Sequence, residues 1–322
     1  MTSEEGSPPL RGTIGPGATV GFVGLGRMGT PMAARLAAAG YRVRGYDVSQ
    51  QALQAWAARA PGGASAAVAV PGLPAVADGA DAVILMLPDS SAVTDVLTGR
   101  GLLSAVAAGT VVADMSSSEP QATRELAAAA ADRGVALVDA PVSGGVRGAE
   151  NGSLTIMAGG ATDDVTRIRG MLAVLGSRVL HVGGVGAGHA VKALNNLLSA
   201  THLLATSEAM TAAARFGLDV PAVLDAINTS TGRSGSSETK WPNFIVPRTF
   251  DSGFDLRLLL KDMRIALGLA EQAGAPARLS AAAVELWAEA AGALPADADH
   301  TEIARWLDPE LTGAPPAPRP GS

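Results

Sequence analysis

The chain of 322 residues contains no cysteine. Disulfides, thiol nucleophiles and cysteine-ligated metal sites are therefore excluded. Four histidines without any cysteine also argue against a catalytic zinc site. Aromatic residues make up only 3% of the chain, against 48% hydrophobic residues. The core must therefore consist mainly of Ala, Val, Leu and Ile, which is ample for a folded enzyme of this size.

Long apolar runs and runs of basic residues are also missing. The most apolar short run, Ala82–Leu87, is far too short to span a membrane. A net charge of -6 argues against nucleic acid as a main partner. The first 17 residues hold two glutamates and no apolar run, so we expect neither a signal peptide nor a transit peptide. We expect a cytoplasmic protein with disordered tails at residues 1–17 and 311–322.

Short apolar segments alternate with alanine-rich segments in the first half of the chain. The predicted strands are Ala18–Val23, Tyr41–Tyr46, Ala82–Leu87, Thr110–Asp114, Val135–Asp139, Leu154–Ala158 and Val179–His181. The predicted helices between them are Pro31–Ala39, Gln50–Arg59 and Gln121–Asp132. Repetition of strand, helix and strand at this spacing predicts parallel βαβ units, and hence an α/β domain with a mostly parallel sheet over residues 18–184.

Strand patterns stop after about residue 184. The predicted helices beyond it are Ala190–Arg215, Val220–Ile227, Leu256–Ala273, Arg278–Ala291 and Thr301–Leu307. A Gly/Ser/Thr-rich loop is predicted at Ser230–Thr239, and Pro221 suits the first turn of its helix. We expect an all-helical domain over residues 185–310 that serves substrate binding and oligomerisation.

A glycine-rich string separates the first predicted strand from the first predicted helix. Its residues are Gly24, Leu25, Gly26, Arg27, Met28 and Gly29. The first glycine permits a tight turn, the second lets the backbone approach a pyrophosphate, and the third lets helix and strand pack closely. The helix N-terminus then offers N–H donors to the phosphates. A plain glycine turn is the alternative in a chain with 39 glycines, but the position favours a dinucleotide-binding, Rossmann-type domain.

Asp47 closes the second predicted strand. A carboxylate at this position accepts hydrogen bonds from ribose hydroxyls and repels a 2′-phosphate. The next residues, Val48–Gln50, include no arginine that would hold such a phosphate. NAD is therefore expected rather than NADP, with helix capping as the alternative role of Asp47.

Lys192 and Asn196 lie four residues apart on one face of the long predicted helix. Their neighbours are mostly apolar, which indicates a lysine partly removed from water. Such burial disfavours the ammonium form and brings lysine closer to a useful acid–base range. A snorkelling lysine on a solvated helix is the alternative.

Five segments occur together and in register with a known family. They are GFVGLGRMGTPMA near the start, DMSSSEP at 114–120, DAPVSGGVRGAENGSLTIMAGG at 139–160, GAGHAVKALNN at 186–196 and GFDLRLLLKDMRIAL at 253–267. Over residues 18–308 the chain resembles the β-hydroxyacid dehydrogenases, which include 3-hydroxyisobutyrate dehydrogenase and tartronate semialdehyde reductase.

The resemblance implies a role for each matching residue. Lys192 is the acid–base lysine, and Asn196 helps to hold the substrate. The substrate carboxylate binds at Ser143, Gly144 and Gly145, and Phe254 lies near the substrate unless it is a packing residue. Leu87, Pro88, Ser117 and Lys261 bind the cofactor. Lys261 reaches the active site from the helical domain, and Asp262 orients that region.

The resemblance also implies the reaction. We expect an NAD-dependent oxidoreductase that transfers hydride between nicotinamide and a small β-hydroxy acid in the cleft between two domains, in a homodimer or homotetramer. Alternatives are a reductase of tartronate semialdehyde or sulfolactaldehyde, or a catalytically silent NAD-binding partner platform. Arg147 and Arg233 would meet a second anionic end of the substrate, or are solvated loop residues. Lys192 and the chain length disfavour an imine reductase and a 6-phosphogluconate dehydrogenase.

Overall fold

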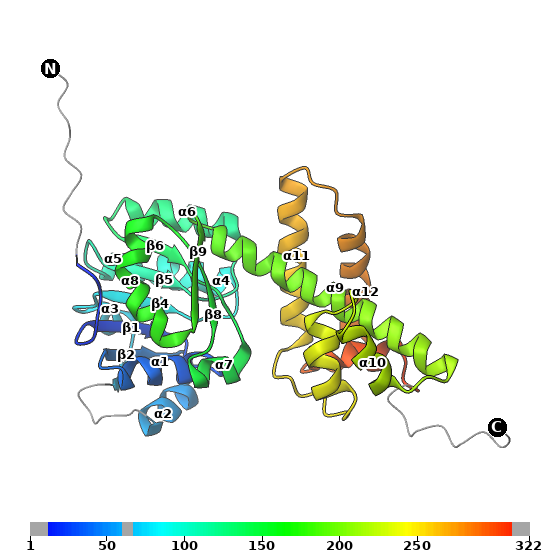
Figure 1. Cartoon of the computed structure of the whole chain (residues 1–322). Helices are drawn as coiled ribbons and strands as arrows, with labels where there is room; N and C mark the ends of the chain where they lie inside the picture. The colour runs from blue at the N-terminus through cyan, green and yellow to red at the C-terminus, as the bar shows by residue number, and fades with distance from the viewer. Residues whose placement is uncertain (1–11, 60–66, 311–322) are drawn as a thin grey trace. The chain divides into compact units, whose positions relative to one another are not determined.

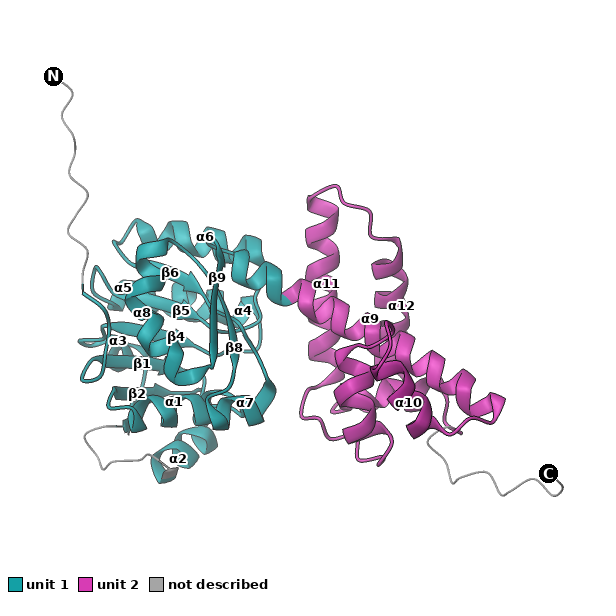
Figure 2. Ribbon diagram, viewed as in Figure 1, with its two compact units in different colours: residues 1–192 teal, residues 193–322 magenta. Residues whose placement is uncertain are grey.

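The computed structural model describes residues 12–59 and 67–310. The chain divides into two compact units, residues 1–192 (unit 1) and 193–322 (unit 2) (Figure 2). The division falls inside a long helix, whereas the sequence predicts a domain boundary just before that helix. The tail predicted from residue 311 onward lies outside the described residues.

Unit 1 contains a mixed sheet surrounded by helices (Figure 1). Its strands are β1 Thr19–Val23, β2 Arg42–Tyr46, β3 Ala67–Ala69, β4 Ala82–Leu85, β5 Val111–Asp114, β6 Ala136–Asp139, β7 Val142–Ser143, β8 Thr155–Gly159 and β9 Arg178–Gly183. Its helices are α1 Gly29–Ala38, α2 Gln50–Arg59, α3 Leu73–Ala77, α4 Ser90–Thr94, the π-helix η1 Asp95–Gly99, α5 Leu102–Ala105, α6 Pro120–Ala131, α7 Gly145–Asn151 and α8 Thr162–Leu175.

The first six strands of unit 1 run parallel in the order β3-β2-β1-β4-β5-β6. Successive connections leave β1 in opposite directions, so the carboxyl ends of β1 and β4 border a switch point, where doubly wound sheets bind their ligands. Beyond β6 the direction changes, because β8 pairs antiparallel with β6 and β7 and parallel with β9. The predicted α/β class with a mostly parallel sheet is confirmed.

Side chains on alternate positions of the central strands enter two separate hydrophobic clusters. Phe22 and Ile84 belong to the cluster that contains α1 and α8 residues, whereas Val23 and Leu85 belong to the cluster of α3, α5 and α6. Successive strand residues point to opposite faces of a sheet. Both faces are therefore covered, which explains why β4 has a continuous apolar sequence.

Unit 2 is helical in its described part. Its elements are the greater part of α9 Ala187–Phe216, α10 Val220–Asn228, the π-helix η2 Ser236–Ile245, α11 Leu256–Gln272, α12 Arg278–Ala293, the short 3₁₀-helix η3 His300–Glu302 and α13 Ile303–Leu307. Trp241 and Trp287 are fully buried in its core. Among the described residues no helix combines the length and apolarity that crossing a membrane requires.

Three sequence predictions are corrected by the structure. The predicted loop Ser230–Thr239 is helical from Ser236 onward, because the Ser234 and Ser237 side chains bond to local backbone groups and Trp241 is buried in the core. Residues 12–17 do not belong to a loose tail, since Ile14 is buried and its N–H donates to Arg167 O at 2.8 Å. The last predicted helix starts as the 3₁₀ turn η3.

Candidate functional site

The glycine-rich segment between β1 and α1 has the geometry of a phosphate-binding loop. Gly24 has a φ of 97°, and a Cβ there would meet Met86 O at 2.2 Å. A Cβ at Gly29 would meet Gly24 O at 1.8 Å, so only glycine lets α1 start this close to β1. A Cβ at Gly26, by contrast, would have nothing within 4 Å. Open space at the middle glycine and close packing at the outer two are what a pyrophosphate needs.

Asp47 lies at the end of β2 and is tied to this loop. Its Oδ2 accepts the Leu25 N–H at 2.7 Å, and its Oδ1 accepts the Ser49 N–H at 2.7 Å. The Ser49 hydroxyl accepts the Ala52 N–H at 3.3 Å, so Ser49 rather than Asp47 caps α2. The carboxylate is thereby fixed beside the loop, where the sequence predicts a ribose contact. These residues fit NAD.

The segments after β4 and β5 are joined to each other. The Leu87 N–H donates to the buried Ser116 hydroxyl at 2.9 Å. Asp114 accepts from the Ser116 N–H at 3.0 Å and from the Ser118 hydroxyl at 2.8 Å. Ser117 is half-buried between these two anchored serines. Leu87 and Ser117, both predicted to line the cofactor, therefore belong to one hydrogen-bonded edge of the sheet.

A buried histidine connects this edge to α9. The Nε2–H of His189 donates to Ser116 O at 3.2 Å, and Nε2 lies 3.7 Å from Asp114 Oδ2. The Nδ1 atom shares a hydrogen bond of 2.8 Å with the Thr123 hydroxyl. The sequence analysis missed His189. Its position three residues before Lys192 was the available signal, because residues at that spacing share a helix face.

Asp139, at the end of β6, anchors the start of α9 through hydrogen bonds. Its two carboxylate oxygens accept the N–H groups of Gly186 at 2.7 Å and His189 at 2.9 Å. Burial raises the pKa of Asp139 above its usual 3.8, an effect that His189 and the two N–H donors offset in part. Gly159 and Gly188 make the approach possible, because a Cβ on either would lie under 3 Å from this carboxylate. The start of α9 is therefore fixed against the sheet.

Lys192 is half-buried and lies in the second turn of α9. The hydrogen bonds of Asp139 and His189 anchor the first turn of α9 and thereby the backbone just before Lys192. The partial burial agrees with the expectation of a lysine partly withdrawn from water.

The predicted carboxylate loop adopts a conformation that needs its glycines. Gly144 has a φ of 130° and Gly145 a φ of 62°, both in the region that favours glycine. Ser143 ends β7, and α7 begins at Gly145. The guanidinium of Arg35 on α1 donates to Glu150 O in α7 at 3.1 Å and to Val174 O in α8 at 3.1 Å. Helix α1, which follows the glycine-rich loop, is thereby linked to α7, which follows the predicted carboxylate loop.

In unit 2, Asp262 joins α11 to α9. Its Oδ2 accepts from Asn196 Nδ2 at 2.6 Å, while Lys261 Nζ lies 3.1 Å from its Oδ1. Asn196 and Asp262 are both buried, and Lys261 is partly exposed. The geometry supports the expectation that Asp262 orients its neighbours.

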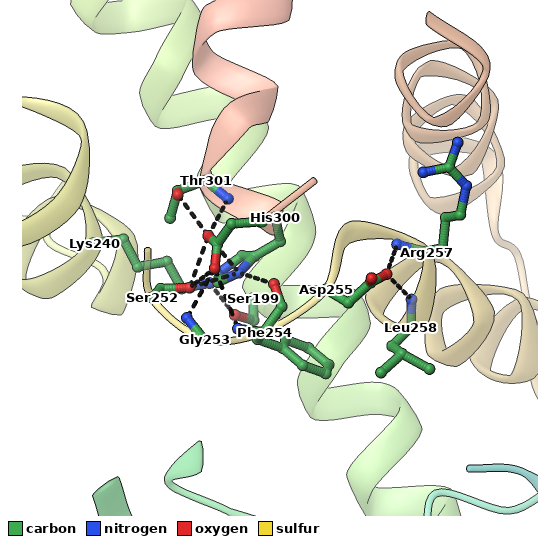
Figure 3. Close-up of polar contacts among 11 residues, drawn as sticks. Ser199, Lys240, Ser252, Gly253, Phe254, Asp255, Arg257, Leu258, His300 and Thr301 are labelled. Carbon is green, nitrogen blue, oxygen red and sulfur yellow. Dashed lines mark hydrogen bonds and ion pairs between the residues drawn. The ribbon is translucent and has the colours of Figure 1, made fainter. Parts of the chain in front are cut away.

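The turn before α11 is organised by Asp299 and by His300, which Figure 3 shows beside Ser252 and Phe254. Asp299 Oδ2 accepts the N–H groups of Gly253 at 2.8 Å and Phe254 at 3.2 Å. The Phe254 ring packs edge-on against the buried His300 ring, with centroids 5.6 Å apart. Phe254 thus has a packing role in unit 2, and its substrate contact stays a prediction.

The predicted site residues divide between the two units. Unit 1 contains those that follow the parallel strands, the last residue of β7 and the lysine near the start of α9: Gly24, Gly26, Gly29, Asp47, Leu87, Ser117, Ser143 and Lys192. Unit 2 joins Asn196 and Lys261 through Asp262. Arg233, a predicted anion contact, forms an exposed ion pair with Glu238 at 3.5 Å.

Two family models match the chain. Residues 19–183 match the NAD binding domain of 6-phosphogluconate dehydrogenase. Residues 186–307 match a domain described as the NAD-binding domain of NADP-dependent 3-hydroxyisobutyrate dehydrogenase. Together the two matches cover both units.

Individual relatives span nearly the whole chain. The 2-(hydroxymethyl)glutarate dehydrogenase of Eubacterium barkeri is 38% identical over 269 residues, which cover 83% of this chain and 87% of the relative. The NAD-dependent L-serine dehydrogenase of Pseudomonas aeruginosa is 34% identical, covering 90% and 98%. The structure of Mycobacterium tuberculosis 3-hydroxyisobutyrate dehydrogenase with L-serine superposes with a TM-score of 0.84 at 33% identity, covering 91% and 99%.

Proposed function

Since the chain belongs to the β-hydroxyacid dehydrogenase family and is an NAD-dependent oxidoreductase acting on CH–OH, we propose that it oxidises a small β-hydroxy acid reversibly, with Lys192 as acid–base group. One observation carries the assignment of Lys192. The first turns of α9 are bonded through His189 and Asp139 to the strand ends that also present Ser117 and Leu87. This anchoring of the helix that carries Lys192 supports the assignment.

Binding of the cofactor would involve the loop at Gly24–Gly29 for the pyrophosphate and Asp47 for the ribose. Bound NAD supplies the hydride acceptor, and the protein supplies orientation and proton transfer. Because the Asp47 carboxylate is fixed by Leu25 and Ser49, it would repel the additional phosphate of NADP.

The substrate would bind through its carboxylate to Ser143, Gly144 and Gly145, where a hydroxyl and backbone N–H groups are suitable anion donors. Lys192 Nζ would accept the proton of the substrate hydroxyl during oxidation and return it during reduction. Asn196, held by Asp262, would bind the substrate one helical turn further on. Lys261 would contribute positive charge near the same residues.

The names of the relatives suggest the substrate class. L-serine, 3-hydroxyisobutyrate and 2-(hydroxymethyl)glutarate all contain the unit HO–CH₂–CH(R)–COO⁻ and differ only in R. Oxidation of this shared chemical group requires an anion site, a proton acceptor and a hydride acceptor. The proposed residues would provide the first two, and bound NAD the third. We therefore propose a substrate of this form, or the corresponding semialdehyde in the reductive direction. We further propose that the enzyme is cytoplasmic. We also propose that it acts as a homodimer or homotetramer, and light scattering would test this oligomeric state.

Replacement of Lys192 by Ala tests the mechanism. Turnover of L-serine, 3-hydroxyisobutyrate and 2-(hydroxymethyl)glutarate is followed as NADH formation, and each is repeated with NADP. Loss of a general acid–base group lowers kcat about 10²- to 10⁴-fold. The Kd of NAD, measured by fluorescence titration, should stay within about threefold. Full turnover by Lys192→Ala would remove the mechanism, and lost NAD binding would instead indicate misfolding.

A further inference from the structure

Lysine is almost absent from this protein. The chain contains 21 arginines but only three lysines, at positions 192, 240 and 261. Positive charge at solvated surfaces is thus supplied by arginine almost throughout. Lysine differs from arginine in carrying a compact ammonium on a flexible stem. Two of the three lysines already belong to the proposed site, so Lys240 stands out as the third.

Lys240 lies in the π-helix η2, directly after the predicted loop Ser230–Thr239, which overlaps the first residues of that helix. Helices of this kind are rare and occur often at functional sites. The side chain is half-buried, and its Nζ donates to the Ser199 hydroxyl on α9 at 2.7 Å (Figure 3). Lys240 is therefore directed toward α9 within unit 2.

Ser199 connects Lys240 to the proposed substrate residues. It lies three residues after Asn196, so the two side chains are neighbours on one helix face. Asn196 is bonded on its other side to Asp262, the partner of Lys261. Two lysines thus approach the same stretch of α9, one through Asp262 and the other through Ser199.

The positive charge of Lys240 affects the pKa of a buried histidine in unit 2. The pKa of His300 is lowered to about 4, first by burial and second by the positive charge of Lys240, while Asp299 acts in the opposite direction. Lys240 is therefore close enough to influence the Phe254–His300 pair electrostatically. A second cation near Asn196 favours an anion in that region.

We propose that Lys240 binds a second anionic group on the substrate, carried by R in HO–CH₂–CH(R)–COO⁻. The inference rests on the proposed function and adds the chemical character of R. Within unit 2, this anion would bind to Lys240 together with the Ser199 hydroxyl. Arg233 is the rival cation, but it is exposed and forms a surface ion pair with Glu238, whereas Lys240 is half-buried against α9.

Substrates that differ in R test the assignment. Initial rates are measured with 2-(hydroxymethyl)glutarate, in which R carries a carboxylate, and with 3-hydroxyisobutyrate, in which R is methyl. For Lys240→Gln, kcat/KM for the dicarboxylate should fall about 10- to 100-fold, mainly through KM, since a charged hydrogen bond is lost. The monocarboxylate should change less than threefold. Lys240→Arg should recover part of the preference, and the matched surface variant Arg233→Gln should retain it.

Calorimetric titration of glutarate and butyrate into the NAD-bound protein gives a readout without turnover. Wild type should bind glutarate at least tenfold more tightly than butyrate, and Lys240→Gln should lose that difference. An unchanged difference in Lys240→Gln, or its loss in Arg233→Gln, would overturn the role of Lys240. Equal wild-type binding of both acids would also overturn it. Absence of turnover with every hydroxy acid would contradict the proposed function itself, while the glutarate comparison would still decide on Lys240.

Discussion

Two buried histidines, one in each unit, differ in how fully their ring nitrogens are hydrogen-bonded. In unit 1, both ring nitrogens of His189 and both oxygens of Asp139 are bonded. In unit 2, His300 is equally buried, yet its Nε2 has no hydrogen-bond partner among the residues that the structure describes. A fully bonded network specifies one geometry, whereas a partly bonded one leaves a buried group costly to ionise. Unit 1 therefore holds a helix in place, and unit 2 contains a group whose protonation affects stability.

The two buried groups also respond to pH in opposite directions. Asp139 has a raised pKa, so its contribution favours folding at low pH and weakens as pH rises through that pKa. His300 has a lowered pKa, so its contribution is fully present above about 6.5 and is lost as pH falls toward 4. The comparison can be tested in each unit separately.

The largest effect is expected for Asp139→Ala. The substitution leaves the buried N–H groups of Gly186 and His189 without an acceptor and removes the anchor of α9. The free energy of unfolding should fall by about 3 kcal/mol, measured by urea denaturation. Asp163→Ala, at an exposed position of α8, is the control and should change stability by less than about 0.5 kcal/mol. Equal effects of both variants would mean that Asp139 is not an anchor.

A smaller effect is expected from the titration of His300. Its neighbours include Lys240, Asp299 and Ser252. Between pH 7 and pH 5 the wild type should lose about 2 kcal/mol from this residue, because the unfolded histidine takes up a proton that the folded one refuses. His300→Asn retains a side-chain nitrogen near the Nδ1 position but cannot titrate. Urea denaturation at both pH values should give a correspondingly smaller loss for this variant, and parallel losses would contradict the assignment.

The smallest effect is expected for Asp262→Asn. The amide has nearly the same shape but no charge, so it holds Lys261 and Asn196 less firmly. Misplacement of substrate contacts should lower kcat/KM about tenfold, while the unfolding midpoint in urea stays nearly unchanged. Arg264→Gln, an exposed change on the same helix, is the matched control. A large loss of stability without loss of activity would make Asp262 a purely structural residue.

Much of the fold was predictable because its signals are local. The strand before Gly24, the strand before Asp47 and the apolar run at Ala82 all occur where they were expected, within one or two residues. The start of helix η2 was not predictable, because the Gly/Ser/Thr-rich stretch Ser230–Thr239 favours a loop, whereas the helix depends on the Ser234–Ser237 hydrogen bonds and the burial of Trp241. His189 escaped notice because its partners, Ser116 and Thr123, are distant in sequence.

The sequence by itself determined the class of domain, the phosphate-binding loop and the identity of the three lysines. Each of these features depends on residue type and on short spacing along the chain. Examples are glycines that lack a Cβ, a carboxylate directly after a strand and a rarely used cation. Only the tertiary structure decided what those residues contact. Asp139 reaches Gly186 and His189 across about 50 positions of chain, and Lys240 reaches Ser199 across about 40. Such pairs depend on how helices pack against strands and against one another, and neither the periodicity nor the composition of the sequence specifies that packing.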